Sequence, residues 1–279
     1  MNNPQVIIIP DVHGRSFWKD AINKFPKDLY PNLQIIFLGD YLDPYESYDG
    51  ISKEEAFVNF EDILDYAKND SRVTLLIGNH DWHYFVYLDN CRMDKARERN
   101  IEHMFKENIS MFRLHKIVKL DGTKYLFSHA GITQKWLDMI ATMAKDEVEK
   151  WNPEKLNLHE DKDESYQWIS KIATINETYD FDLFETSLKY HDLNFFSAPI
   201  SMISRERGGY YPYGSLIWAD IYEHIFNDDL PEFYQIFGHT YSFPNTHDPS
   251  ISPNGKCFAM LDCGKAFTLD IEGNIELLK

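Results

Sequence analysis

Carboxylate, amide and imidazole side chains follow five short apolar runs in this chain, at residues 6–9, 36–38, 73–77, 125–127 and 234–237. The side chains at the ends of these runs are Asp11 and His13, Asp40, Asn79, His129 and His239. A glycine lies close to each of them. Divalent cations are bound by carboxylate and amide oxygens, and imidazole suits zinc, iron and manganese. This mixture of residue types therefore predicts a metal site.

The spacing of these residues indicates how ions would be shared. Asp11 and His13 are two residues apart, so both side chains point the same way on an extended chain and can reach one ion. Asp40 is the natural bridging residue, because one carboxylate has two oxygens. Two ions about 3.5–4 Å apart polarise a phosphate and lower the pKa of a bridging water, which then attacks phosphorus. Each motif alone is common, and the prediction of phosphoester hydrolysis rests on their joint occurrence.

Apolar runs that end in glycine and a polar residue are typical of buried strands with ligands at their carboxyl ends. The expected strands are 5–9, one ending at Asp40, 72–77, a hairpin of 114–120 and 124–127, then 232–237, 257–261, 266–271 and a short strand after 272–274. The expected helices are 17–25, one opened by a capping box of Ser52 and Glu55, a polar region from Trp82, and 133–151. Residues 44–50 are expected to form a turn. This order predicts an α/β sandwich of two mixed sheets flanked by helices.

Composition narrows the class of protein. The 279 residues are expected to form a single domain, with a mostly helical cap or insertion at about residues 152–214 that would set substrate choice.

The formal net charge of −17 disfavours nucleic acid as a partner. The three cysteines lack disulfide or zinc-ribbon spacing, which favours the cytoplasm. No apolar run is long enough for a membrane span, and the run 6–9 is expected to be a strand rather than part of a signal peptide.

The five blocks together resemble the calcineurin-like metallophosphoesterase superfamily, whose pattern is Asp-x-His, Gly-Asp-x-x-Asp, Gly-Asn-His-Asp/Glu, a lone His and Gly-His. The resemblance implies that Asp11, His13 and Asp40 hold a first ion, and that Asp40, Asn79, His129 and His239 hold a second. It further implies that His80 protonates the leaving oxygen while Asp43 orients its imidazole. An acidic partner is expected to raise the pKa of such a histidine. Two Mn²⁺ ions are the expected cofactors, with iron and zinc as alternatives.

Finer features are similar to the phosphoprotein phosphatase (PPP) branch and its bacterial relatives, which include symmetrical dinucleoside tetraphosphatases. The last block, residues 238–241, lacks the second histidine found in many other members, and the segment 216–220 looks like the Leu-Trp-x-Asp segment of the branch. Two departures stand out. Pro10 replaces a glycine, and Pro44-Tyr45 stands where the branch carries an arginine that binds phosphate. Three arginines are candidates to replace it: Arg15, Arg205 and Arg207.

The expected function is hydrolysis of a phosphorylated small molecule, nucleotide or phosphoprotein. Two alternatives remain open: a dinucleoside polyphosphate hydrolase, and a non-catalytic metal-binding scaffold. The complete ligand set and His80 count against a scaffold, which has no chemical need of them. A nuclease is disfavoured by the acidic charge. Tyr210, Tyr211 and Tyr213 are expected either to pack in the structure or to stack on a base.

Overall fold

The protein is described by a computed structural model, which covers residues 4–86, 91–139, 200–226, 230, 233–241 and 258–279. The strands are β1 (Pro4–Ile9), β2 (Gln34–Phe37), β3 (Val73–Leu76), β4 (Phe112–Arg113), β5 (His115–Leu120), β6 (Thr123–Ser128), β7 (Tyr234–Phe237), β8 (Phe258–Met260), β9 (Phe267–Asp270) and β10 (Ile275–Leu277). The α-helices are α1 (Phe17–Asn23), α2 (Glu46–Asp49), α3 (Lys53–Asn69), α4 (Asn79–Val86), α5 (Glu98–Glu107) and α9 (Ile221–Phe226). The described residues also contain two 3₁₀ turns, η1 (Ile109–Met111) and η4 (Arg205–Arg207).

The strands form two mixed sheets. The first has the order β10-β9-β1-β2-β3-β4 and the second β5-β6-β7-β8. In the first sheet β1, β2, β3 and β4 run parallel, whereas β9 and β10 are antiparallel to their neighbours. In the second sheet the β5–β6 hairpin is antiparallel, and β6, β7 and β8 are parallel. The predicted sandwich is therefore confirmed.

Alternation along β1 shows how the layers are built. Val6 and Ile8 pack between the two sheets, against side chains such as Phe127 of β6. Ile7 and Ile9 point to the opposite face and join the core beneath the helices. Successive strand residues point to opposite faces, so a strand buried on both sides reads as a continuous apolar run.

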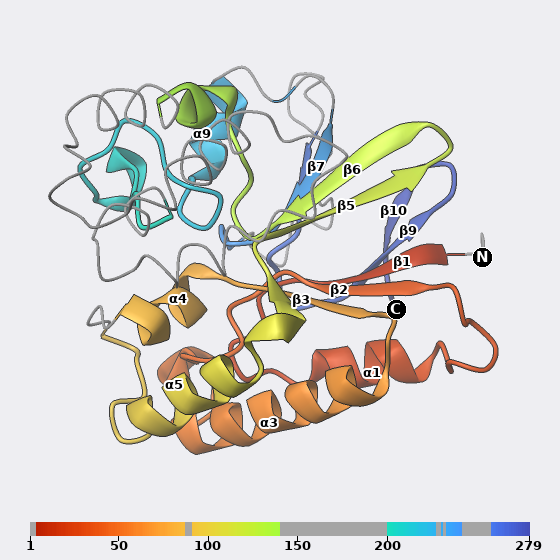
Figure 1. The fold of residues 1–279 in the computed structure, drawn as a ribbon, viewed down its shortest axis with the longest axis horizontal. Helices are drawn as coiled ribbons and strands as arrows, with labels where there is room; N and C mark the ends of the chain where they lie inside the picture. Colours follow the sequence, from red (N-terminus) through yellow and green to blue (C-terminus); the bar gives the residue numbers. More distant parts are fainter. Residues whose placement is uncertain (1–3, 87–90, 140–199, 227–229, 231–232, 242–257) are drawn as a thin grey trace, which may run out of the picture.

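Helices cover the outer faces of the sandwich. In Figure 1, α1, α3 and α5 lie together along one side of the first sheet, and α9 lies beside the second. Helix α3 begins with the predicted capping box, in which the Ser52 side chain accepts from Glu55 N–H and the Glu55 carboxylate accepts from Ser52 N–H. Phe60, Ile63 and Leu64 face inward from α3 as expected. The capping box fixes the start of a helix that buries one side of the first sheet.

Several boundaries differ from expectation. Residues 44–50 were expected to turn, but they contain the short helix α2, which ends at Gly50 with φ 68°. Strand β2 ends at Phe37, three residues before Asp40, because the backbone adopts a left-handed conformation at Asp40. Of the expected helix 133–151, residues 134–139 are helical and 140–151 lie outside the described residues.

The predicted helical cap also falls largely outside the described residues, because 152–199 are not among them. The described remainder, residues 200–214, holds the single 3₁₀ turn η4 and a bridge between Ser204 and Tyr211. Among the described residues, no helix is both long and apolar enough to cross a membrane.

Candidate metal centre

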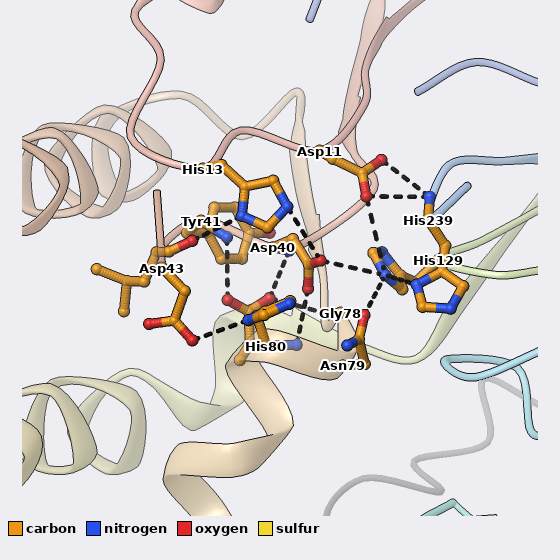
Figure 2. A network of polar contacts seen from close by, with 12 residues as sticks. Asp11, His13, Asp40, Tyr41, Asp43, Gly78, Asn79, His80, His129 and His239 are labelled. Atoms are coloured by element: carbon orange, nitrogen blue, oxygen red, sulfur yellow. Dashed lines mark hydrogen bonds and ion pairs between the residues drawn. The ribbon is translucent and has the colours of Figure 1, made fainter. Parts of the chain in front are cut away.

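The carboxyl ends of five strands, from both sheets, meet at one edge of the sandwich. Figure 2 shows the side chains that follow β1, β2, β3, β6 and β7 turned toward one another there. They are Asp11, His13, Asp40, Asn79, His129 and His239, and all but the partly buried His239 are buried. The structure thus brings together every metal ligand expected from the sequence.

Backbone geometry at the strand ends aims these side chains inward. Asp40 has φ 54° and His13 has φ 44°, values that L-residues seldom adopt. The carbonyl of Asp40 accepts hydrogen bonds from the N–H groups of Val12 (3.1 Å) and His13 (2.7 Å), which ties the first motif to the second. These bonds offset the cost of the left-handed backbone.

Two glycines leave room for the carboxylates. A Cβ atom at Gly78 would overlap Asp40 Oδ1, and one at Gly238 would overlap Asp11 Oδ2. The N–H of His239 also donates to both oxygens of Asp11, at 3.0 and 3.1 Å. The glycines beside the predicted ligands are therefore required by close approach of a carboxylate to the backbone.

Two groups of ligand atoms share one carboxylate. Asp11, His13 and Asp40 form one group, and Asp40, His129 and His239 form the other, with the donor atoms of each group within 4.8 Å of one another. Asn79 Oδ1 lies 3.0 Å from Nε2 of His129, at the edge of the second group. Asp40 thus belongs to both groups, which is the position expected of a bridging ligand.

Hydrogen bonds set the orientation of two imidazoles. Nδ1 of His13 lies 2.8 Å from the carbonyl of Leu42, and Nδ1 of His129 lies 2.8 Å from the carbonyl of Leu38. A carbonyl can only accept a hydrogen bond, so each Nδ1 carries a hydrogen, and the Nε2 of each neutral imidazole presents a lone pair to the centre. Such bonds to the second nitrogen are a regular feature of histidines that bind metals.

The centre is rich in lone pairs. Nε2 of His129 faces Asp40 Oδ2 at 3.5 Å and Nδ1 of His239 at 3.1 Å, in addition to Asn79 Oδ1. Electron-rich atoms this close repel one another unless protons or cations lie among them. The donor set, the burial and the crowding of lone pairs therefore fit divalent cations.

The pKa values follow from burial. Burial raises the pKa of Asp40 to about 6, and the nearby Asp11 carboxylate adds to this effect. Burial lowers the pKa of His13, assisted by the positive charge of Arg92, and burial likewise lowers the pKa of His239. These two imidazoles are therefore neutral at pH 7 and can act as ligands without losing a proton.

His80 and Asp43 lie beside the ligands and contact each other. Nδ1 of His80 donates to Asp43 Oδ2 at 2.8 Å, and the hydroxyl of Tyr84 donates to Asp43 Oδ1 at 2.7 Å. The acidic partner was expected to raise the pKa of His80, but the pKa of this imidazole lies below the ordinary histidine value. Burial lowers that pKa, and the positive charge of Arg92 lowers it further. The pair thus has the predicted geometry, with His80 neutral.

Only one of the three candidate arginines is among the residues that line the pocket. Arg207 lines the pocket over the ligands, pairs with Asp220 at 2.7 Å and donates to the hydroxyl of Thr240. Arg15 instead forms a two-point ion pair with Asp49, at 3.2 and 3.1 Å. Arg205 is exposed on η4. Neither Arg15 nor Arg205 is among the pocket residues.

Sequence reasoning missed several residues of the site. The pocket has a volume of about 470 Å³, and its walls include Tyr45, Arg92, Trp218 and Asp262 besides the expected residues. Trp218 belongs to the segment that looks like Leu-Trp-x-Asp, which was a usable signal. Arg92 and Asp262 carry no motif in the sequence. Tyr211 and Tyr213 pack against the main core, and Tyr210 is 93% exposed.

Comparison with known proteins agrees with this geometry. The sequence model of the family described as calcineurin-like phosphoesterase matches residues 4–243. That span runs from the first residue of β1 past His239, so it includes all the predicted ligands. No curated protein sequence gives a significant match to the chain.

Proposed function

This chain belongs to the calcineurin-like phosphoesterase family of hydrolases, and we propose that it is a two-metal phosphomonoesterase of the PPP-like branch. The observation that carries the proposal is the place of Asp40 in both groups of candidate ligands. A shared carboxylate is what a pair of neighbouring ions requires. The branch assignment rests on the single histidine of the last block and on Trp218 in the pocket wall.

Asp11, His13 and Asp40 would hold one ion, and Asp40, Asn79, His129 and His239 the other. The mixed oxygen and nitrogen donors suit manganese, with iron or zinc as the alternatives. Bound ions supply Lewis acidity toward phosphate oxygens and lower the pKa of a water molecule. The remaining chemistry falls to the side chains around them.

His80 is the proposed proton donor to the leaving oxygen. Asp43 holds Nδ1 of its ring, so Nε2 is the nitrogen that faces the pocket. Proton donation requires the imidazolium, and the anionic substrate together with Asp43 would favour that form. Asp43 therefore acts as a positioning residue, which fixes the ring and stabilises its positive charge.

The charge of the pocket favours a terminal phosphate over a phosphodiester. The guanidinium of Arg207 lines a pocket that also contains four of the candidate metal ligands, which are His13, Asp40, Asn79 and His239. A monoester carries nearly two negative charges at pH 7, whereas a diester carries one. With two divalent cations bound, the local positive charge would stabilise the dianion more.

A substrate panel tests this proposal. Metal-stripped protein supplied with Mn²⁺ is assayed on p-nitrophenyl phosphate, bis-p-nitrophenyl phosphate and a dinucleoside tetraphosphate. The proposal predicts Mn²⁺-dependent turnover of the monoester and at least about 100-fold lower kcat/KM on the diester. Preference for the tetraphosphate would favour a dinucleoside polyphosphate hydrolase. Absence of turnover on all three, with metal bound, would favour the scaffold alternative.

A further inference from the structure

Arg92 lines the pocket but has no role in the proposed function. Arg92 follows α4 and is half-buried in the pocket wall. It carries a permanent positive charge, because the guanidinium does not lose its proton in proteins. It matches none of the five motif blocks, so nothing in the sequence pattern assigns it a role.

Three contacts hold its guanidinium at the reaction site. Nη1 donates to the carbonyl of Asp43 at 3.1 Å. Nη2 donates to Nε2 of His80. The guanidinium carbon also lies 3.6 Å from the centre of the Tyr45 ring, a cation–π contact.

Arg92 contacts the nitrogen of His80 that takes part in the proposed proton transfer. Nε2 is the atom from which His80 would donate a proton to the leaving oxygen. A donor that already touches this atom lies within one hydrogen bond of the place where the ester oxygen must sit. Because a neutral imidazole is a weaker acceptor than a phosphate oxygen, a bound phosphate would compete for the same N–H groups.

Tyr45 explains how the guanidinium is held there. Its ring contacts both the guanidinium of Arg92 and the imidazole of His13, and the ring centres of Tyr45 and His13 lie 5.4 Å apart. Pro44-Tyr45 directly follows the second block, where the resemblance led us to expect an arginine. The chain thus has a tyrosine just after the block and brings an arginine onto its ring from beyond α4.

We propose that Arg92 binds the substrate phosphate directly and that Tyr45 positions it, so that Arg92 replaces the arginine missing just after the second block. This inference rests on the proposed function and deepens it. The fork of Arg92 contacts phosphate oxygens on the His80 side of the pocket, and Arg207 lies in the same pocket wall. Arg15 and Arg205 take no part.

The test is phosphate binding to the Mn²⁺-loaded protein, measured by calorimetry, with metal content measured on the same samples. The variants are Arg92→Ala and Arg92→Lys, and the control is Arg99→Ala, an exposed arginine on α5. We expect Arg92→Ala to weaken phosphate binding about 10- to 100-fold with metal content unchanged, because a charged two-point contact is lost. Arg92→Lys should recover part of the loss, and added guanidinium ion should partly rescue Arg92→Ala.

Tyr45 is tested by its own pair of variants. Tyr45→Phe keeps the ring and should bind phosphate like the wild type, whereas Tyr45→Ala should lose about 3- to 10-fold. A merely structural tyrosine would not show this rescue by phenylalanine together with unchanged metal content.

The outcomes separate this inference from the proposed function. If the wild type binds Mn²⁺ and phosphate and Arg92→Ala binds both equally well, the inference is overturned and the proposed function stands. If Arg92→Ala loses its metal ions, Arg92 is structural and the inference is also overturned. If the wild type binds no Mn²⁺, the proposed function itself fails and the inference falls with it.

Discussion

The carboxylate of Asp81 accepts a hydrogen bond of 2.7 Å from the backbone N–H of Asp40. Asp81 also accepts from the N–H groups of Tyr41 at 3.0 Å and Gly78 at 2.9 Å. One fully buried side chain therefore fastens the loop after β2 to the loop after β3. Because Asp40 belongs to both groups of ligands, Asp81 supports the centre through the backbone that carries Asp40.

Replacing Asp81 tests this relationship. Asp81→Asn keeps the size of the side chain but sets an amide N–H₂ against backbone donors. We expect a loss of about 10- to 100-fold in Mn²⁺ affinity, as is usual when groups that support metal ligands are changed. Calorimetric titration with Mn²⁺ measures this. Asp65→Asn, a highly exposed aspartate on α3, is the control, and equal affinity in both variants would contradict the account.

The role of His80 is tested with leaving groups of different basicity. His80→Asn should lower kcat about 100- to 10,000-fold on an alkyl phosphate, because a basic alkoxide needs a proton to depart. The loss should be much smaller on p-nitrophenyl phosphate, whose leaving group is stable as an anion. Steady-state kinetics on both substrates, with metal content checked, gives the comparison.

Asp43→Asn provides the matched variant for that experiment. It keeps a hydrogen-bond acceptor near Nδ1 of His80 but removes the negative charge, so its effect should follow the same order and be smaller. An equal loss on both substrates in His80→Asn would argue that His80 supports the site rather than donating a proton.

The strand ends and their ligands could be predicted because the signals are local. A short apolar run, a glycine and a polar residue stand next to one another in the sequence, and the capping box of Ser52 and Glu55 spans only four residues. The contacts of Arg92 could not be predicted in this way. They depend on where the chain goes after α4, which no local pattern encodes.

The ionisation of Asp40 predicts how metal binding depends on pH. Burial raises its pKa to about 6 in the metal-free protein, whereas the pKa values of His13 and His239 are lowered. Metal binding requires the ionised carboxylate. Affinity for Mn²⁺ should therefore be nearly constant above about pH 6 and fall about tenfold per pH unit below it. Titrations between about pH 5 and pH 8 measure this dependence.

A midpoint near 7 in that pH dependence would contradict the burial of the imidazoles, because it would report ligand histidines with ordinary pKa values. An affinity independent of pH down to about 5 would contradict the raised pKa of Asp40.

Stability away from the site depends on a buried ion pair between Arg72 and Asp70. Nη2 of Arg72 lies 2.7 Å from Asp70 Oδ2, and Nη1 donates to the carbonyls of Phe25 and Tyr30 at 3.0 Å each. Burial acts to raise the pKa of Asp70, but hydrogen bonds from Arg72 lower it to about 2. The pair therefore ties the end of α3 and the start of β3 to the segment after α1.

Arg72→Met should lower the free energy of unfolding by about 2 kcal/mol at pH 7. A carboxylate with a lowered pKa contributes stability above its unfolded pKa of about 4, and this is lost as the pH falls to about 2. The variant should therefore lose less stability than the wild type over that range. Urea unfolding at several pH values tests this, with Lys68→Met, an exposed pair with Asp65, as control. Equal pH dependence in wild type and Arg72→Met would contradict the account.

Arg15 illustrates the limit of sequence reasoning at the site. It lies two residues from His13, so proximity in sequence made it a candidate for phosphate binding. In the structure its guanidinium turns to Asp49 of α2, within residues expected to form only a turn. A helix of four residues is too short to show periodicity, and it supplied the partner that redirected the arginine.

The most direct test of the account is the metal stoichiometry of the metal-stripped protein after titration with Mn²⁺, for the wild type beside Asp40→Asn. A shared carboxylate predicts two ions per wild-type chain, and loss of both binding and p-nitrophenyl phosphate turnover in Asp40→Asn. One ion per chain, or two ions and full turnover retained in Asp40→Asn, would contradict a centre built on that bridge.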